Sequence, residues 1–145
     1  MTTNLPEGIH SFLDGAGWGD CVIEPLPGDA SFRRYFRIRA ADGTRTAMLM
    51  DAPPPQEDTG PFLHVGKWLT DNGLRAPAIY AEDGTRGFVL MEDFGDTRMR
   101  DHLDIVPQDE IAAYRTAIDA LTALHGLPPG PFDPYDMAVY QREAA

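Results

Sequence analysis

The nine-residue stretch SFRRYFRIR, residues 31–39, restricts the fold of this chain more than any other segment. Its side chains alternate between the two sides of an extended backbone, which predicts a β-strand. One of these sides carries Phe32, Arg34, Phe36 and Ile38. A turn signal at Ala41-Asp42-Gly43 and the apolar stretch TAMLM, residues 46–50, predict that the chain then reverses into an antiparallel neighbour.

The segments around this hairpin extend it into an α+β fold. A short amphipathic helix is expected over residues 6–16, and a strand over residues 21–26. After a proline-rich break, the spacing of apolar residues predicts a helix over residues 61–72, with Gly73 as its C-cap. The stretches AIYAED and RGFVLMEDF, with DGT as the turn, predict a second hairpin. The expected result is a five-stranded antiparallel sheet with a helix packed on it.

The character of the chain changes after Gly95, and the residues beyond it are predicted to be helical. A short helix is expected within TRMRDHL and a longer one over residues 107–125. The longer helix carries a stripe formed by Ile111, Tyr114, Ile118, Leu121 and His125. The last residues, MAVYQREAA, are typical of the start of a further helix, so the chain is expected to end within an element. We therefore divide it into a mixed unit, residues 1–95, and the beginning of a helical unit, residues 96–145.

The overall charge argues against several classes of partner. Twelve Lys and Arg residues stand against 23 Asp and Glu residues, which gives a net charge of −11. Binding to nucleic acids and to anionic membranes both depend on positive charge, so neither is expected. Cys21 is the only cysteine, and the sequence has no signal-peptide pattern and no apolar run of about 18 residues. A cytoplasmic protein without an intramolecular disulfide is therefore predicted.

Arg34 falls on the apolar side of the strand over residues 31–39, where an unpaired guanidinium would be costly to bury. It therefore requires either a carboxylate partner, such as Asp51 or Glu57, or a bound anion such as a phosphate. The alternation places three more arginines on the other side of the strand, namely Arg33, Arg37 and Arg39. We interpret these three as a solvated strand face.

Two further features allow either a structural or a binding interpretation. Residues 27–31 join two predicted strands, and their backbone amides with the Ser31 hydroxyl can cradle a phosphate or form a plain tight turn. The apolar strand that stops at Glu92 and Asp93 either reaches water there or leaves backbone groups free to bind a flat heterocycle. The sequence contains no metal-ligand spacing of His, Cys and acidic residues and no nucleophile-elbow motif, so no metal site and no catalytic residue is predicted.

Four segments in a fixed order resemble those of one protein family. They are ASFRRYFRI, AMLMDAPP, GLRAPAIYAEDGTRGFVLMEDFGD and ALTALHGLPP, of which MDAPP and LMEDFGD are the most specific. From about Leu5 to its C-terminus, the chain resembles the aminoglycoside phosphotransferase (choline-kinase-like) family. Within that family it is most similar to bacterial kinases that phosphorylate N-acetylmuramate and N-acetylglucosamine at the anomeric carbon for cell-wall recycling.

The resemblance implies a protein-kinase-like N-terminal lobe at residues 1–95 that ends in a hinge, followed by the first helices of a truncated C-terminal lobe. ATP is the implied cofactor. Its adenine would dock on the hinge, where Met91 directly precedes the hinge, the Glu92 carbonyl accepts a hydrogen bond and the Phe94 amide donates one. The implied loop over the phosphates consists of Asp29, Ala30, Ser31 and Phe32. The helix over residues 61–72 would be the single helix of the lobe.

The chain departs from the kinase pattern at two places. Protein kinases bind the α- and β-phosphates with a lysine on the third strand, but that strand contains no lysine here. Arg34 or Arg33 is the implied replacement, with Glu57 as a candidate for the acid that orients it. The H-G-D-x-x-x-x-N loop of the family, which supplies the base and a Mg²⁺ ligand, is absent, and asparagine occurs only at Asn4 and Asn72.

Two functions remain open at this point. In the first, the chain is the ATP-binding portion of an amino-sugar kinase that moves the γ-phosphate of ATP to a sugar hydroxyl. It would be inactive alone, and Mg²⁺ and the sugar would bind only in the complete protein. In the second, the chain is a non-catalytic nucleotide- or partner-binding module derived from that fold. Self-association through the helix over residues 107–125 is then expected, because its apolar stripe needs a partner.

Overall fold

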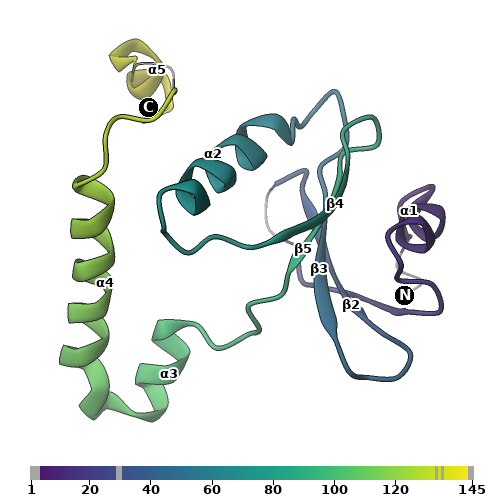
Figure 1. Ribbon diagram of the computed structural model, residues 1–145, viewed down its shortest axis with the longest axis horizontal. Helices are drawn as coiled ribbons and strands as arrows, with labels where there is room; N and C mark the ends of the chain where they lie inside the picture. The colour runs from purple at the N-terminus through teal and green to yellow at the C-terminus, as the bar shows by residue number, and fades with distance from the viewer. Residues whose placement is uncertain (1–3, 29–30, 133, 135, 144–145) are drawn as a thin grey trace.

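The computed structural model describes residues 4–28, 31–132, 134 and 136–143. In Figure 1 the strands form one sheet with helices on both of its sides, and further helices extend beyond it. In chain order the elements are α1 (Ile9–Gly15), β1 (Val22–Pro25), β2 (Arg34–Arg39), β3 (Thr46–Asp51), α2 (Gly60–Asp71), β4 (Ile79–Asp83), β5 (Phe88–Glu92), α3 (Met99–Ile105), a 3₁₀ turn (Pro107–Asp109), α4 (Glu110–His125) and α5 (Met137–Glu143). The predicted α+β class is confirmed.

The five strands form one antiparallel sheet in the order β1-β2-β3-β5-β4. β5 lies between β3 and β4, and four of its residues are buried, namely Phe88, Val89, Leu90 and Met91. Since this strand is covered on both faces, it has no solvent side, which explains the unbroken apolar run in its sequence.

The register of the sheet determines which strand ends lie together. Asp51 at the end of β3 pairs with Arg34 at the start of β2 and with Phe88 at the start of β5. Ala47, near the start of β3, pairs with Glu92 at the end of β5. The start of β2 and the end of β5 therefore lie at opposite ends of the sheet.

The two faces of the sheet carry separate apolar clusters. We call the side covered by α1 the α1 face; its cluster consists of Ile9, Leu13, Trp18, Phe36, Ile38, Ala47, Leu49, Phe88 and Leu90. The opposite side is the α2 face; its cluster consists of Met50, Ala52, Val89 and Met91, with Met48, Phe62 and Leu63 packed against it. None of the α2 residues is fully buried, so α2 covers its face only in part.

The boundaries of several elements differ from the predicted ones by a few residues. The helix expected over residues 6–16 is the shorter α1, and the strand expected over residues 31–39 begins at Arg34. The helix expected over residues 107–125 is divided into the 3₁₀ turn and α4. Gly73 follows α2 with a φ of 77°, as the predicted C-cap requires.

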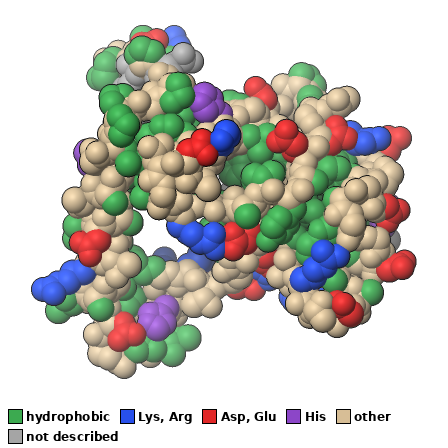
Figure 2. Space-filling model, viewed as in Figure 1, with side chains coloured by type: hydrophobic (Ala, Val, Ile, Leu, Met, Phe, Trp, Pro, Cys, Tyr) green, Lys and Arg blue, Asp and Glu red, His purple; other side chains and the backbone are tan. Residues whose placement is uncertain are grey.

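The helices after residue 96 lie mostly away from the sheet. In the segment after α4, Phe132 packs against α2, with ring centroids 5.4 Å from His64 and 5.2 Å from Trp68. The space-filling view shows a gap between α4 and the sheet (Figure 2). The apolar residues of the predicted stripe are exposed along α4, namely Ile111, Tyr114, Ile118 and Leu121.

Within the described ranges, no helix has the length and apolar character that a membrane crossing requires.

Candidate functional site

The chain leaves the sheet at Glu92, and residues 93–96 form an irregular segment that we call the linker. The Glu92 amide donates to the carbonyl of Ala78 at 2.8 Å, and the Glu92 carboxylate accepts hydrogen bonds from the Ala78 amide at 3.2 Å and from Arg75 Nη1 at 2.9 Å. The Arg75 guanidinium lies over the Phe94 ring, 4.7 Å from its centroid. The end of β5 is thus fixed by β4 and the segment before it.

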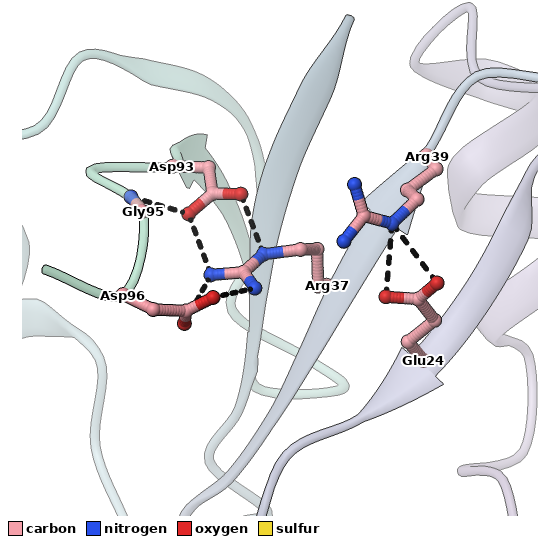
Figure 3. A network of polar contacts seen from close by, with 6 residues as sticks. All are labelled: Glu24, Arg37, Arg39, Asp93, Gly95 and Asp96. Atoms are coloured by element: carbon pink, nitrogen blue, oxygen red, sulfur yellow. Dashed lines mark hydrogen bonds and ion pairs between the residues drawn. The ribbon is translucent and has the colours of Figure 1, made fainter. Parts of the chain in front are cut away.

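Arg37, in the middle of β2, fixes the linker from the other side (Figure 3). It donates to Asp93 through Nε at 2.7 Å and Nη2 at 3.1 Å, and to Asp96 through Nη1 at 2.7 Å and Nη2 at 2.8 Å. The side chains of Arg37 and Asp93 are only 7% and 4% exposed, whereas Asp96 is 77% exposed. Two carboxylates held by one guanidinium give strong and directional attachment.

The linker turns back on itself around this network. Asp93 Oδ1 also accepts from the Gly95 amide at 2.9 Å, and Gly95 has a φ of 78°, a conformation that glycine adopts without strain. The interpretation of Arg37 as part of a solvated strand face is wrong, because the linker folds back over β2 and covers it. Arg39 does remain exposed, and it pairs with Glu24 at 2.9 Å.

Hydrogen bonding in this network lowers the pKa of both acids. Burial acts to raise the pKa of Asp93, but hydrogen bonds from Arg37 and the Gly95 amide outweigh it, and the pKa lies below its usual value. The Arg37 hydrogen bond lowers the pKa of Asp96. Hydrogen bonds to Asp96 and Asp93 in turn raise the pKa of Arg37, so all three groups stay charged at neutral pH.

This network should make part of the stability dependent on pH. Because the folded-state pKa values of Asp93 and Asp96 are depressed, their contribution is present above the unfolded value of about 3.9 and is lost as the pH falls through the folded values. We expect the difference in unfolding free energy between wild type and Arg37→Lys to shrink from about pH 6 to about pH 3. Urea denaturation at several pH values measures this, and a constant difference would contradict it.

Arg33 and Arg34 lie on opposite faces of the sheet. Arg34 donates to Asp51 Oδ2 through Nε at 2.9 Å and Nη2 at 2.6 Å, and to the Asn4 carbonyl at 3.0 Å. Of the partners considered for Arg34, Asp51 is therefore the one present. Glu57 instead accepts a hydrogen bond from Arg33 Nε at 2.7 Å.

The predicted site residues fall into two groups at opposite ends of the sheet. Met91 is buried on the α2 face, and Glu92 and Phe94 flank the start of the linker. Ser31 and Phe32 are exposed just before β2, while the predicted positions Asp29 and Ala30 lie outside the described residues. The strands β2 and β3 run between these two ends along the α2 face.

Two hollows lie on opposite faces of the sheet, and they differ in their position relative to the predicted site residues. One, of about 580 Å³, lies on the α1 face around Arg34, Asp51 and Arg86, away from the linker. Another, of about 350 Å³, lies along α2 and is lined by Arg33 and Phe62 among others. We place the candidate site on the α2 face, because the linker network and Arg33 both lie there.

Sequence reasoning missed the Arg37 network. Its signal was present as two acids three residues apart, Asp93 and Asp96, directly after a buried strand, together with an arginine in the middle of another strand. Within the residues described, no group of three or more His, Cys, Asp and Glu side chains is arranged to hold a metal ion. We derive no step through Mg²⁺.

A five-stranded antiparallel sheet with a helix on one face and a linker at its end is consistent with a kinase-like N-terminal lobe. A family model described as the phosphotransferase enzyme family (APH) matches residues 22–144. The chain belongs to this family, and the predicted resemblance is confirmed.

Curated relatives with the printed name N-acetylmuramate/N-acetylglucosamine kinase are similar to this chain. The protein from Pseudomonas aeruginosa is 41% identical over 131 residues, which cover 88% of this chain and 38% of that protein. The Pseudomonas putida protein is 36% identical over 148 residues, covering 99% of this chain and 42% of its own length. The Caulobacter vibrioides protein is 32% identical, covering 81% and 39%. The chain thus spans about two-fifths of the length of these relatives.

Proposed function

We propose that this chain is the ATP-binding portion of a kinase that transfers the γ-phosphate of ATP to a hydroxyl group of an amino sugar. The observation that carries the proposal is the linker, which Arg37 holds through the carboxylates of Asp93 and Asp96, while no described residue accepts a hydrogen bond from the Phe94 amide. The names of the relatives support an amino sugar as the acceptor. A cytoplasmic role in cell-wall recycling belongs to the same proposal.

Adenine recognition would use the backbone at the end of β5. Among the residues that the structure describes, none accepts a hydrogen bond from the Phe94 amide. The Glu92 carbonyl and the Phe94 amide together offer one acceptor and one donor, which match the edge of an adenine ring. Met91, buried beside them, would close the apolar side of the site.

Phosphate binding would occur at the other end of β2. Ser31 and Phe32, with Asp29 and Ala30 outside the described residues, remain our proposal for the loop over the phosphates. No contact in the structure tests the phosphate role predicted for Arg34, and its guanidinium is engaged by Asp51 on the α1 face.

We expect the 145-residue chain to bind nucleotide without turning it over. Phosphoryl transfer requires an aspartate to accept the hydroxyl proton and ligands for Mg²⁺. The only asparagines are Asn4 and Asn72, and neither follows a His-x-Asp motif. Binding of Mg²⁺ and of the sugar is accordingly proposed for the complete protein alone.

Calorimetric titration with ATP and with adenosine tests backbone recognition at the linker. Phe94→Pro removes the amide and should weaken both ligands about tenfold or more, the usual effect of leaving a buried partner without its hydrogen bond. Phe94→Ala keeps the amide, and Glu92→Gln keeps the carbonyl, so both should bind within about threefold of wild type. Equal losses for Phe94→Pro and Phe94→Ala would assign the effect to the ring and contradict the proposal.

The alternative, a partner-binding module without catalysis, is favoured by one observation. Ile111, Ile118 and Leu121 on α4 are each more than half exposed. Exposed apolar patches of this kind often mark interaction surfaces. Wild-type protein that binds neither ATP nor adenosine but self-associates with rising concentration would favour this alternative.

A further inference from the structure

We infer that Arg33, oriented by Glu57, supplies the positive charge at the phosphate end of the site. Protein kinases place a lysine there and pair it with a glutamate from a helix. The inference rests on the proposed function. It identifies the residue pair that would take the place of that lysine and glutamate in this chain.

The third strand offers no cation of its own. On the α2 face, β3 presents Met48 and Met50. The single lysine, Lys67, lies on α2 and is paired with Asp71 at 2.7 Å, and its side chain is 75% exposed. We therefore look for this positive charge on a neighbouring strand of the same face.

β2 is that neighbouring strand, and the arginines within it and directly before it differ in their availability. Arg37 is committed to the linker, and Arg39 is exposed and paired with Glu24. Arg33 lies beside the loop that precedes β2 and lines the hollow along α2 together with Pro61 and Phe62. It is therefore the arginine of this face that lies at the phosphate end.

The spacing along β2 agrees with the length of a nucleotide. Arg33 and Arg37 are four residues apart, which corresponds to about 13 Å of extended strand. That span is comparable with the distance from the base of a nucleoside triphosphate to its phosphates. A nucleotide whose base lies at the linker would thus place its phosphates near Arg33.

The pair with Glu57 holds only one edge of the guanidinium. Arg33 Nε donates to Glu57 Oε2 at 2.7 Å, and the Arg33 side chain remains 32% exposed. A planar guanidinium can bind a carboxylate with one edge and a phosphate with another. The Glu57 amide donates to the Pro53 carbonyl at 3.1 Å, which fixes the segment between β3 and α2 that carries the acid.

The charge of Arg33 is secure, since the hydrogen bond with Glu57 raises its pKa. Arg34, the neighbouring candidate, points to the α1 face and is bound by Asp51 and the Asn4 carbonyl. It therefore lies across the sheet from Met48 and Met50, the residues that the third strand presents on the α2 face.

Titration of the 145-residue chain with ATP and with adenosine separates phosphate recognition from base recognition. Arg33→Gln should weaken ATP about tenfold or more and leave adenosine within about twofold, because one charge-assisted hydrogen bond is lost. Arg33→Lys should restore part of the ATP affinity, and Glu57→Gln should reduce it less than Arg33→Gln does. Arg39→Gln, which removes the same charge from the same strand, should change neither affinity.

The two ligands also distinguish the possible failures. Unchanged ATP affinity in Arg33→Gln, with adenosine still bound, would overturn the inference and leave the proposed function standing. Equal losses for ATP and adenosine would show a structural effect of Arg33 and would overturn it too. Wild-type protein that binds neither ligand would overturn the proposed function and this inference with it.

Discussion

Replacing Arg37 with glutamine should lower the free energy of unfolding by about 3 kcal/mol, the lower end of the range for breaking a buried ion pair. The cost arises because Asp93, only 4% exposed, would keep its charge without a cationic partner. The lower end applies because Asp96 is largely solvated and loses less. Urea denaturation near neutral pH measures the change, and the linker should become more susceptible to proteolysis in the same variant.

Arg39→Gln is the matched control for this experiment. It removes an arginine two residues along the same strand, from an exposed pair with Glu24, and should cost about 1 kcal/mol or less. In the double variant Arg37→Gln/Asp93→Asn, part of the stability should return, because the unpaired charge is gone. Equal losses of unfolding free energy in Arg37→Gln and Arg39→Gln would show that the buried network contributes no more stability than an exposed ion pair.

Gly87→Ala should be the most damaging single methyl addition in the sheet, with a loss of about 3 kcal/mol or more. Gly87 precedes β5 with a φ of 79°, which side-chain-bearing residues rarely adopt. A methyl group there would also overlap the backbone carbonyl of Ala52, the residue directly after β3. The two backbones approach closely because the Ala52 amide donates to the Gly87 carbonyl at 2.9 Å.

Gly84→Ala in the same turn provides the comparison. No atom lies within 4 Å of the position a methyl group would take at Gly84, so its effect should stay within about 0.5 kcal/mol. Thermal and urea unfolding of both variants would measure the contrast. A stable Gly87→Ala variant would mean that β5 can shift against β3, and then the linker would not be fixed by the sheet register.

Much of the fold was predictable because it depends on local patterns. The alternation before Arg39 and the unbroken apolar run from Phe88 to Met91 each predicted a strand, and both strands are present. Proline at the start of α2 and Gly73 after it predicted that helix to within a residue or two. The motifs around residues 48–54 and 90–96 predicted the family, which the comparisons confirm.

The details of the site were less predictable because they depend on which strands pair. Alternation placed Arg34 on an apolar face and required a partner, but it left Asp51 and Glu57 as equal candidates. The register settles the matter: Asp51 lies directly opposite Arg34, whereas Glu57 lies beyond β3 on the other side. No property of the residues near Arg34 in the sequence contains that information.

The sequence by itself determined the strands, the helices, the end of β5 as a candidate binding segment and the absence of a kinase lysine. Only the tertiary structure decided that Arg37 is buried and Arg39 exposed, although both lie on one side of one strand. The physical reason is that burial of a β-strand side chain depends on what covers the strand. Here the linker covers the strand. Asp93 of the linker is 56 residues from Arg37 in the sequence, and the carboxylates of Asp93 and Asp96 attach the linker to Arg37.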